Sequence, residues 1–311
     1  MKPTCAVIVL NYNGRGLLSQ FLESVVVAAD SARVCHTRVI VLDNASTDDG
    51  IQWVQTHLRT VEIVSAPSNR FLYSYNWLAQ VLDCELLLLL NNDIEMRPDC
   101  LDPLYDTLLY RPGTFSVTPQ MYQMDRITIN SGYWTGRFSK GELDISLGGP
   151  VDTLTPTVFG SGGALLLRRR EFLSLGGFDK LYYPAYWEDI DLCYRAWKRD
   201  MRSYCQPDSV MYHVHSASTK HNVSFQSKRV RMIDRNRWLF VWRNIAERRI
   251  LIFNMYWTAI HCASLIRRRE WEILETYQEA LRHWKRALAG RPHAEQGRVL
   301  SDAQIIDAVK P

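Results

Sequence analysis

The sequence lacks the glycine patterns of the common nucleotide-binding loops. Gly14-Arg15-Gly16 resembles the start of a dinucleotide fingerprint, but Ser19 occupies the position of the third glycine. A glycine-rich phosphate loop ending in Gly-Lys-Ser or Gly-Lys-Thr does not occur either. These absences exclude a Rossmann dehydrogenase and a P-loop enzyme.

Paired cysteines, excess charge and long apolar runs are also missing. The seven cysteines are scattered, odd in number and contain no Cys-x-x-Cys pair, so neither a disulfide framework nor a structural zinc site is expected. The formal net charge of +4 over 311 residues is too mild for an obligate nucleic-acid binder. The apolar stretch near the N-terminus is too short for a signal peptide's core, and the leucine run at 86–90 is too short to span a membrane. We therefore expect a reduced, cytoplasmic protein that binds no nucleic acid.

Short apolar runs alternate with helical stretches through the first hundred residues, which is typical of βαβ units in a largely parallel sheet. The pattern predicts strands at 5–10, 38–42, 61–64 and 85–90 and helices near 17–29, 49–58, 74–82 and 99–109. Each strand ends in polar residues, at 11–13, 43–46, 65–69 and 91–93. Since ligands of open α/β sheets lie outside the carboxyl ends of the strands, these four polar tips outline a pocket.

The rest of the chain shows a change of character at two points. Residues 120–157 are rich in Gly, Ser and Thr, which predicts loops and short strands that cover the site or face an acceptor. A second ordered block follows, with a strand at 164–167, a helix at 170–175, a helix at 189–199 and a strand at 209–215. We expect a catalytic domain over 1–224, divided into a nucleotide-binding half (1–119) and an acceptor half (120–224), and a helical extension over 225–311.

Two acids at strand tips are candidate ligand contacts. Asp43 either belongs to a capping turn with residues 44–48 or accepts a hydrogen bond from a base or a ribose hydroxyl. Asp93, which follows Asn91 and Asn92, either lies in an ordinary turn or offers hard oxygen ligands to Mg²⁺ or Mn²⁺. Such an ion would in turn hold a diphosphate.

Three more acids begin the predicted helix at 189–199. Asp191 and Arg195 are i, i+4 partners, which favours a structural ion pair. Glu188 and Asp189 have no such partner within the helix, and the aromatic loop 182–187 precedes them. This carboxylate pair could supply a general base beside a sugar-binding wall.

The strand at 209–215 carries two histidines on one face, because His213 and His215 alternate with Val214. Each is either an ordinary core or surface residue or a ligand of a metal or a phosphate.

Taken together, these motifs resemble those of the family 2 glycosyltransferases, which have the GT-A fold, an α/β fold with a mostly parallel central sheet. The matching stretches occur in family order from about residue 5 to about residue 245, and they are Asn11-Tyr12-Asn13-Gly14, residues 42–48, residues 90–93, residues 160–164, Gly176-Gly177-Phe178-Asp179 and residues 188–192. Within the family, the sequence is most similar to the rhamnosyltransferase-like and galactofuranosyltransferase-like branch that builds bacterial surface polysaccharides.

The resemblance implies an inverting, metal-dependent transfer of a sugar, rhamnose being one candidate, from a dTDP- or UDP-sugar to a hydroxyl of a glycan or a lipid-linked acceptor. It places the nucleoside-diphosphate sugar against Asn11, Tyr12, Asn13, Asp43, Asn69, Asn76 and Asn92. It assigns the divalent ion, Mg²⁺ or Mn²⁺, to Asp93 with His213 or His215. It assigns the deprotonation of the acceptor to Asp189, with Glu188 beside it.

Two positions depart from the family pattern. Many members have Asp-x-Asp where this chain has Asn91-Asn92-Asp93, so metal binding would depend more on the histidine and on the phosphates of the donor. The glycine expected after Asn69 is also missing, which leaves the donor contact near Asn76 open. Two alternatives remain: a nucleotidyltransferase, for which residues 11–14 lack the basic, glycine-rich character, and a non-catalytic sugar-nucleotide or glycan-binding module.

The C-terminal extension is basic and aromatic. Arginines at 248–249 and 267–269 flank an apolar, aromatic stretch that contains Asn254 and His261. Such a helix is typical of peripheral contact with an anionic membrane surface, which would suit a lipid-linked acceptor. The alternative is a helical hairpin packed on the catalytic domain or on a second subunit of a homo-oligomer.

Overall fold

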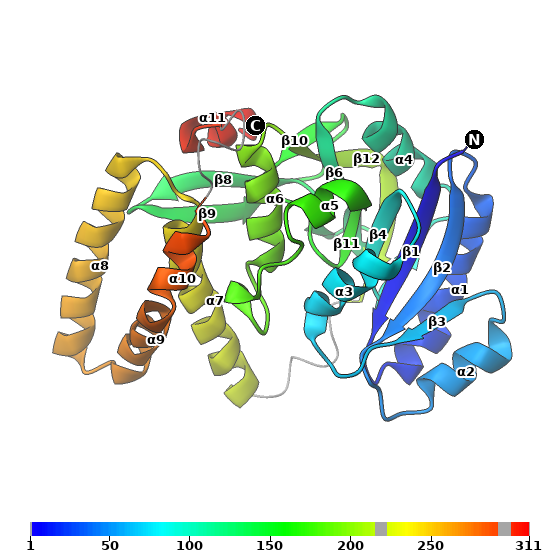
Figure 1. Cartoon of the computed structure of the whole chain (residues 1–311), viewed down its shortest axis with the longest axis horizontal. Coiled ribbons are helices and arrows are strands. Elements are labelled where there is room, and N and C mark those ends of the chain that lie inside the picture. The colour runs from blue at the N-terminus through cyan, green and yellow to red at the C-terminus, as the bar shows by residue number, and fades with distance from the viewer. Residues whose placement is uncertain (1, 215–222, 292–299, 311) are drawn as a thin grey trace.

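The computed structural model describes residues 2–214, 223–291 and 300–310 (Figure 1). The strands are β1 (Thr4–Asn11), β2 (His36–Asp43), β3 (Glu62–Ser65), β4 (Leu86–Asn91), β5 (Ile94–Met96), β6 (Thr114–Gln123), β7 (Ile129–Ser131), β8 (Trp134–Ser139), β9 (Glu142–Leu147), β10 (Thr155–Thr157), β11 (Ala164–Arg168) and β12 (Arg202–His213). The α-helices are α1 (Arg15–Ser31), α2 (Gly50–His57), α3 (Ser74–Val81), α4 (Leu101–Tyr110), α5 (Arg169–Ser174), α6 (Glu188–Lys198), α7 (Val223–Asn244), α8 (Arg248–Arg268), α9 (Trp271–Arg282), α10 (Trp284–Ala289) and α11 (Asp302–Ala308), and short 3₁₀ turns form at Phe71–Tyr73 and Lys180–Tyr182.

The main sheet has the order β10-β12-β6-β11-β4-β1-β2-β3, with β5 paired to β12 and β7 paired to β6. The pairs β1–β2, β1–β4, β2–β3 and β6–β12 are parallel, whereas β11 runs antiparallel to both of its neighbours. A separate antiparallel hairpin, β8–β9, lies between this sheet and the C-terminal helices. The predicted α/β class with a mostly parallel central sheet and a C-terminal helical extension is therefore confirmed.

The leucine run at 86–90 explains how the sheet is stabilised. All five side chains are at most 1% exposed, because β4 lies in the interior of the sheet between β1 and β11. Leu86, Leu88 and Leu90 point into the core that α1, α2 and α4 cover, while Leu87 and Leu89 point into the core that α3, α5, α6 and α7 cover. A strand buried on both faces reads as a continuous apolar run, as predicted.

The four strands and four helices expected in the first hundred residues are present in the expected order, with bounds that shift by a few residues, but the short strand β5 was not predicted. The long strand β6 was not predicted. Its sequence, TFSVTPQMYQ, lacks the apolar pattern of a buried strand, because several buried side chains are polar and make hydrogen bonds within the protein. Ser116 Oγ lies 2.8 Å from Ser203 Oγ, and Thr118 Oγ1 donates to the Ala164 carbonyl. The neighbouring strand β12 begins at Arg202 rather than at 209, with a register shift beside Pro119, which has no N–H to donate to the ladder.

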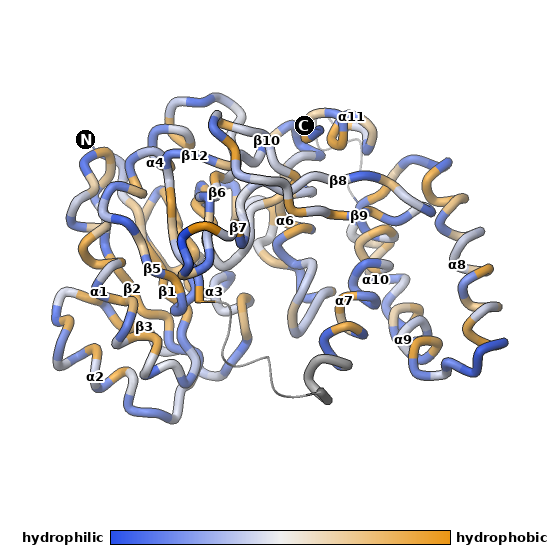
Figure 2. The backbone as a smooth tube through the Cα atoms, turned by 180° about the vertical axis from the view of Figure 1, so that it is seen from behind, coloured by the Kyte–Doolittle hydropathy of each residue, from blue (hydrophilic) through white to orange (hydrophobic). Residues whose placement is uncertain are grey.

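The C-terminal helices pack beside the β8–β9 hairpin and α6, and α8 forms the outer edge of the molecule, at the opposite end from β1, β2 and β3 (Figures 1 and 2). Helix α11 returns to contact α6 and β8, where buried Asp302 makes an ion pair with buried Lys198. The division of the chain at residue 224 stays a prediction. Within the described residues, no helix is long and apolar enough to cross a membrane.

Candidate active site

The polar strand tips meet at one edge of the sheet, as predicted. In the register of the parallel strands, Asn11 lies beside Asp43, Leu10 beside Asn91, and Asp43 beside Ser65. Asparagines and acids that are far apart in the sequence are therefore neighbours in space, and this edge is where an open α/β sheet binds its ligand.

Asp43 is 5% exposed, and both of its carboxylate oxygens accept hydrogen bonds from within the protein. Ser46 donates its hydroxyl to Oδ1 at 2.5 Å and its backbone N–H to Oδ2 at 3.1 Å, while the Asn11 amide donates to Oδ1 at 3.2 Å. This is a tight turn after β2, but not a helix cap, because α2 begins only at Gly50. A contact of Asp43 with the nucleoside stays a prediction.

Asn11 at the end of β1 contacts Asn92, which directly follows β4. Asn92 donates its amide to Asn11 Oδ1 at 2.8 Å, and Asn11 is completely buried. Gly14 packs against this pair so closely that a Cβ atom there would lie 2.2 Å from Asn92 Nδ2 and 2.4 Å from Asn11 Oδ1. The glycine of this motif is therefore required by packing.

The remaining predicted donor contacts differ in position. Tyr12 is 50% exposed, and Asn13 holds the loop by accepting a hydrogen bond from the Thr47 backbone N–H at 2.7 Å. Asn69 accepts from the Phe71 backbone N–H in a turn where Phe71 has a φ of 53°.

Asn76 is not brought together with the others. Its Nδ2 donates to the Phe178 carbonyl at 2.8 Å, and its Oδ1 accepts from the Phe178 N–H at 2.9 Å. Both the nitrogen and the oxygen of the side-chain amide therefore hold the loop after α5. Asn76 lines a separate cavity with Asp179 and Arg243. The observed contacts give it a structural role, and its role in donor binding stays a prediction.

Asp93, between β4 and β5, and His213, at the end of β12, form a predicted pair of metal ligands. Because β5 pairs with β12, and the Val214 N–H donates to the Asp93 carbonyl, the two side chains face each other with His213 Nε2 3.1 Å from Asp93 Oδ2. The other ring nitrogen, Nδ1, lies 2.9 Å from Asn130 Oδ1, which fixes the orientation of the ring. No motif in the sequence marks Asn130, so sequence reasoning missed this contact.

The Asp93–His213 pair fits a divalent cation, although a complete ligand set is not present. Asp93 Oδ1 is buried and has no hydrogen-bond partner among the described residues, so an acceptor oxygen is available. The part of the chain that the structure describes holds no group of three or more His, Cys, Asp or Glu side chains that could hold a metal ion. His215, the other predicted ligand, lies outside the described residues. Ligands to complete the shell would have to come from the substrate or from water.

Glu188 and Asp189 begin α6 directly after two residues in the left-handed region, Tyr186 (φ 72°) and Trp187 (φ 76°). Asp189 accepts hydrogen bonds from the backbone N–H of Gly162 at 3.1 Å and of Ile190 at 2.9 Å. The strained backbone at Tyr186 and Trp187 turns the chain so that the start of α6 lies next to the loop 160–163. The position of Asp189 is therefore fixed from two elements.

The two carboxyl groups differ in their environment. Burial raises the pKa of the Glu188 carboxyl well above its ordinary value, and the charge of Asp189 raises it further; Glu188 is 4% exposed, and its Oε2 has no partner among the described residues. Burial also raises the pKa of Asp189, but the N–H groups of Gly162 and Ile190 oppose this shift. Adjacent carboxyls in unequal environments favour a protonated Glu188 beside an ionised Asp189.

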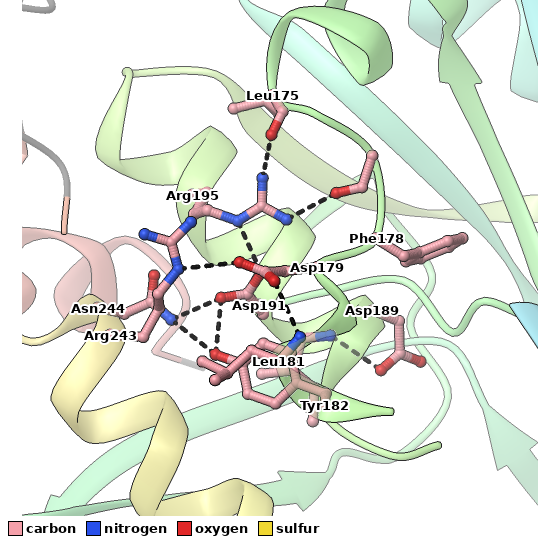
Figure 3. Close-up of polar contacts among 12 residues, drawn as sticks. Leu175, Phe178, Asp179, Leu181, Tyr182, Asp189, Asp191, Arg195, Arg243 and Asn244 are labelled. Carbon is pink, nitrogen blue, oxygen red and sulfur yellow. Dashed lines mark hydrogen bonds and ion pairs between the residues drawn. The ribbon is translucent and has the colours of Figure 1, made fainter. Parts of the chain in front are cut away.

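A buried network holds α6 in place (Figure 3). Arg195 donates to Asp191 Oδ2 at 2.6 Å and to the Leu175 carbonyl at 2.6 Å. Tyr182 and Asn244 both donate to Asp191 Oδ1 at 2.8 Å. The predicted structural ion pair of Asp191 is therefore observed, and it ties α6 to α7 and to the loop after α5.

A cavity of about 930 Å³, which we call the catalytic cavity, brings the candidates together. Glu188 and Asp189 line it together with His213, so the base candidate and the metal candidate lie on the same side of the molecule. Asp93 reaches it through its contact with His213, whereas Asp43 is not among the lining residues. Helix α7 adds Arg229 and Arg237, which sequence reasoning did not assign to the site.

This combination of fold and site agrees with the comparisons to known proteins. Residues 6–173, more than half of the chain, match the family described as Glycosyl transferase family 2. The chain belongs to this family.

Two relatives and one solved structure are similar to the chain at low identity. The chain is 27% identical over 236 residues to the O-antigen biosynthesis protein RfbC of Myxococcus xanthus. This alignment covers 70% of this chain but only 18% of that protein. It is 25% identical over 257 residues to the N-acetylglucosaminyl-diphospho-decaprenol L-rhamnosyltransferase of Mycobacterium tuberculosis, covering 70% of this chain and 78% of that one. The structure of GalNAc-T7 with UDP, GalNAc and Mn²⁺ superposes with a TM-score of 0.60 at 15% identity, over 79% of this chain and 49% of that chain. The family match gives glycosyl transfer as the class of reaction, and the structural similarity supports the GT-A fold.

Proposed function

We propose that this chain is an inverting, metal-dependent glycosyltransferase that moves a sugar, with rhamnose as the first candidate, from a dTDP- or UDP-sugar. The acceptor is a hydroxyl of a glycan or of a lipid-linked sugar in cell-surface polysaccharide synthesis. The observation that carries this proposal is that Asp189 and His213, with Asp93 behind the histidine contact, meet at one cavity. One side of the cavity can receive the diphosphate and the other can receive the acceptor.

The metal would be held by Asp93 and His213. A bound Mg²⁺ or Mn²⁺ would stabilise the negative charge that develops on the diphosphate as it leaves. The buried, unpartnered Oδ1 of Asp93 supports this assignment, as does the Mn²⁺ in the structure of GalNAc-T7.

Asp189 is the proposed general base. Its carboxylate takes the proton from the acceptor hydroxyl as the hydroxyl oxygen attacks the anomeric carbon, and the bond from that carbon to the diphosphate oxygen breaks on the opposite face. Burial raises the pKa of this carboxyl and so makes it a stronger base than an exposed aspartate, while two backbone N–H groups oppose the shift and orient the carboxylate. Burial raises the pKa of the neighbouring Glu188 carboxyl, which favours its neutral form and so limits the negative charge beside Asp189.

Arg229 is a further candidate for contact with the donor. Its guanidinium lies 5.5 Å from the centre of the Tyr186 ring in the catalytic cavity, and its Nε is buried with no hydrogen-bond partner among the described residues. A buried guanidinium N–H without a partner is suited to a phosphate oxygen.

The identity of the sugar and the acceptor rests on the relatives. One of them is a rhamnosyltransferase whose acceptor is a lipid-linked diphospho-sugar, and the other takes part in O-antigen biosynthesis. We propose that the reaction takes place in the cytoplasm at the inner face of the membrane, where such an acceptor would be met.

Helix α8 supports contact with a membrane surface. Ile252, Phe253, Met255 and Tyr256 are 66%, 55%, 72% and 59% exposed, although the opposite side of the helix buries Asn254 and Leu265. Figure 2 shows hydrophobic segments along this outermost helix. An exposed apolar side with arginines at both ends is typical of a helix that lies in the interface of an anionic bilayer. Pairing of this side with a second copy of the chain is the alternative.

The proposed function is tested by incubating the chain with sugar nucleotides, including dTDP-rhamnose, and a short-chain lipid analogue of N-acetylglucosaminyl diphosphate, with Mn²⁺ or Mg²⁺. Transfer predicts release of free nucleoside diphosphate together with a glycosylated acceptor. Release of pyrophosphate would indicate a nucleotidyltransferase instead. Binding of a sugar nucleotide without any release would indicate a non-catalytic module.

A further inference from the structure

A second cavity lies next to the catalytic cavity, between the β8–β9 hairpin and helices α7, α8 and α9. Its volume is about 630 Å³, which is within the range of small-molecule sites, about 300–1,000 Å³. Asp144 and Arg237 line both cavities, so the two are adjacent. Helix α7 runs along both, contributing Arg229 to the first and Asp234 to the second. A ligand whose reactive end lies in the catalytic cavity could therefore extend into the second one.

The walls of the second cavity are aromatic. Trp238 stacks on Tyr277, and both are 5% exposed, so this stacked pair is a rigid part of the wall. Trp257 of α8 is only partly buried, and Lys140 lies 5.2 Å from the centre of its ring. Its indole Nε1 is buried and has no hydrogen-bond partner among the described residues. The apolar face of a sugar ring can pack on such an indole, while the N–H donates to a sugar hydroxyl.

The polar groups of the second cavity are mixed: the acids Glu142, Asp144 and Asp234, the basic side chains Lys140, Arg237 and His261, and the hydroxyls of Ser139, Thr258 and Ser264. Glu142 is occupied, since it accepts from the Trp238 indole at 2.9 Å and pairs with Arg237 at 3.4 Å. Asp234 is partly buried and makes no hydrogen bond within the described part of the chain, and burial raises the pKa of its carboxyl. Asp144, at the junction, lies 3.6 Å from Arg137. Carboxylates accept hydrogen bonds from hydroxyl groups, and the acids and basic groups together leave the cavity without a large excess of either charge.

This chemistry selects among the parts of the proposed reaction. The acids offset Lys140 and Arg237, so the cavity has no excess of positive charge to bind the diphosphate of the donor or of a lipid-linked acceptor, and the polar lining disfavours an acyl chain. A neutral saccharide presents both apolar ring faces for aromatic walls and hydroxyls for carboxylates.

We infer that the second cavity binds neutral sugar units of the acceptor glycan, next to the unit whose hydroxyl receives the transferred sugar. This inference rests on the proposed function, because only that function makes the bound saccharide an acceptor. It adds that the C-terminal helices and the β8–β9 hairpin form part of the substrate site and strengthen the binding of acceptors that carry further sugar units.

The test is a binding experiment on the full chain without donor or metal, so it measures no turnover. The probes are neutral di- and trisaccharides of rhamnose, galactose, glucose and N-acetylglucosamine, observed by saturation-transfer NMR and then titrated. Trp257→Ala removes the aromatic wall, and Trp271→Ala removes a 53% exposed tryptophan outside the cavity as the matched control. Asp234→Asn retains the shape of the cavity and removes its partly buried negative charge, and thermal unfolding of each variant reports on folding.

We expect at least one trisaccharide to bind the wild-type chain and Trp271→Ala equally. Its binding should be about tenfold or more weaker in Trp257→Ala, and weaker also in Asp234→Asn. The inference is wrong if no probe binds the wild-type chain, or if Trp257→Ala and Trp271→Ala bind the trisaccharide equally well. Since no donor is present, saccharide binding can succeed when nucleoside diphosphate release fails, and the reverse, so the two proposals are tested separately.

Discussion

Asp93 Oδ2 lies 3.1 Å from His213 Nε2, although 120 positions separate the two residues in the sequence. Both side chains are shielded, at 16% and 19% exposed, and the contact results from the pairing of β5 with β12. The pairing of the short strand β5, which directly follows Asp93, therefore brings this acid next to His213 at the end of β12. This geometry gives the first prediction.

Replacing His213 by alanine should weaken metal-dependent binding of the nucleoside diphosphate. We expect a loss of about tenfold or more, because the imidazole is one of the few protein ligands available to the ion. Isothermal titration with UDP and dTDP, in Mn²⁺ and again in EDTA, measures the effect. The control is His36→Ala, an exposed histidine at the start of β2. Equal metal dependence in His213→Ala and wild type would refute the assignment.

Two glycines that are close in sequence should respond in opposite ways to alanine. At Gly14 a Cβ atom would collide with the Asn11–Asn92 pair, so Gly14→Ala should lower the free energy of unfolding by about 1–3 kcal/mol and weaken donor binding. At Gly16, inside α1, nothing lies within 4 Å, so Gly16→Ala should be neutral or raise stability by about 0.5–1 kcal/mol. Urea unfolding of both variants gives the comparison. A harmless Gly14→Ala would show that the strand tip is looser than described.

The sequence predicts the strand tips well but not the side-chain contacts behind them. Apolar runs and polar ends set the edge of the sheet, so Asn11, Asp43 and Asp93 could be placed there in advance. The structural role of Asn76 could not be predicted from the sequence, because its contact with Phe178 joins residues 102 positions apart and depends on how α3 packs near the loop after α5. No periodicity in the sequence reports such a contact.

The stability of the chain should depend on pH through Glu188. Because burial raises the pKa of this carboxyl in the folded chain, the unfolded chain gives up its proton first as pH rises, and stability falls from about pH 4.5 upward until the folded-state pKa is passed. Glu188→Gln cannot ionise, so it should unfold at a higher temperature than wild type at pH 8, with a difference that shrinks toward pH 4.5. Thermal unfolding between pH 4.5 and 8 measures this. An unchanged difference across that range would contradict a buried, protonated Glu188.

Charges placed on the outer side of α8 should release the chain from membranes. Ile252→Glu combined with Met255→Glu should abolish flotation with vesicles that contain anionic lipid, because both residues lie on the exposed apolar side of the helix. The matched control is Ile127→Glu combined with Val81→Glu, two other exposed apolar residues. Deletion of the tail is unsuitable, since it would remove Asp302 and leave Lys198 buried without its counter-charge. If wild type does not float but sediments as a dimer that the α8 variant disrupts, this side of α8 is a subunit contact.

The C-terminal extension shows a further limit of sequence reasoning. The basic, aromatic composition of 225–311 indicates helices with an exposed apolar side, and α8 has one. The same composition cannot show that α7 also carries Arg229 into the catalytic cavity, because that depends on the packing of α7 against α6 and β9. Residues that reach a site from a distant helix become visible only in three dimensions.

The central claim is that Asp189 acts on the acceptor while Asp93 and His213 act on the donor. It is tested most directly by Asp189→Asn, with Asp208→Asn, an exposed aspartate on β12, as the control. We predict that sugar transfer falls by about 10²–10⁴-fold in Asp189→Asn while the dissociation constant of the donor stays within about twofold of wild type. Transfer at the wild-type rate, or an equal loss of transfer and donor binding, would contradict the account.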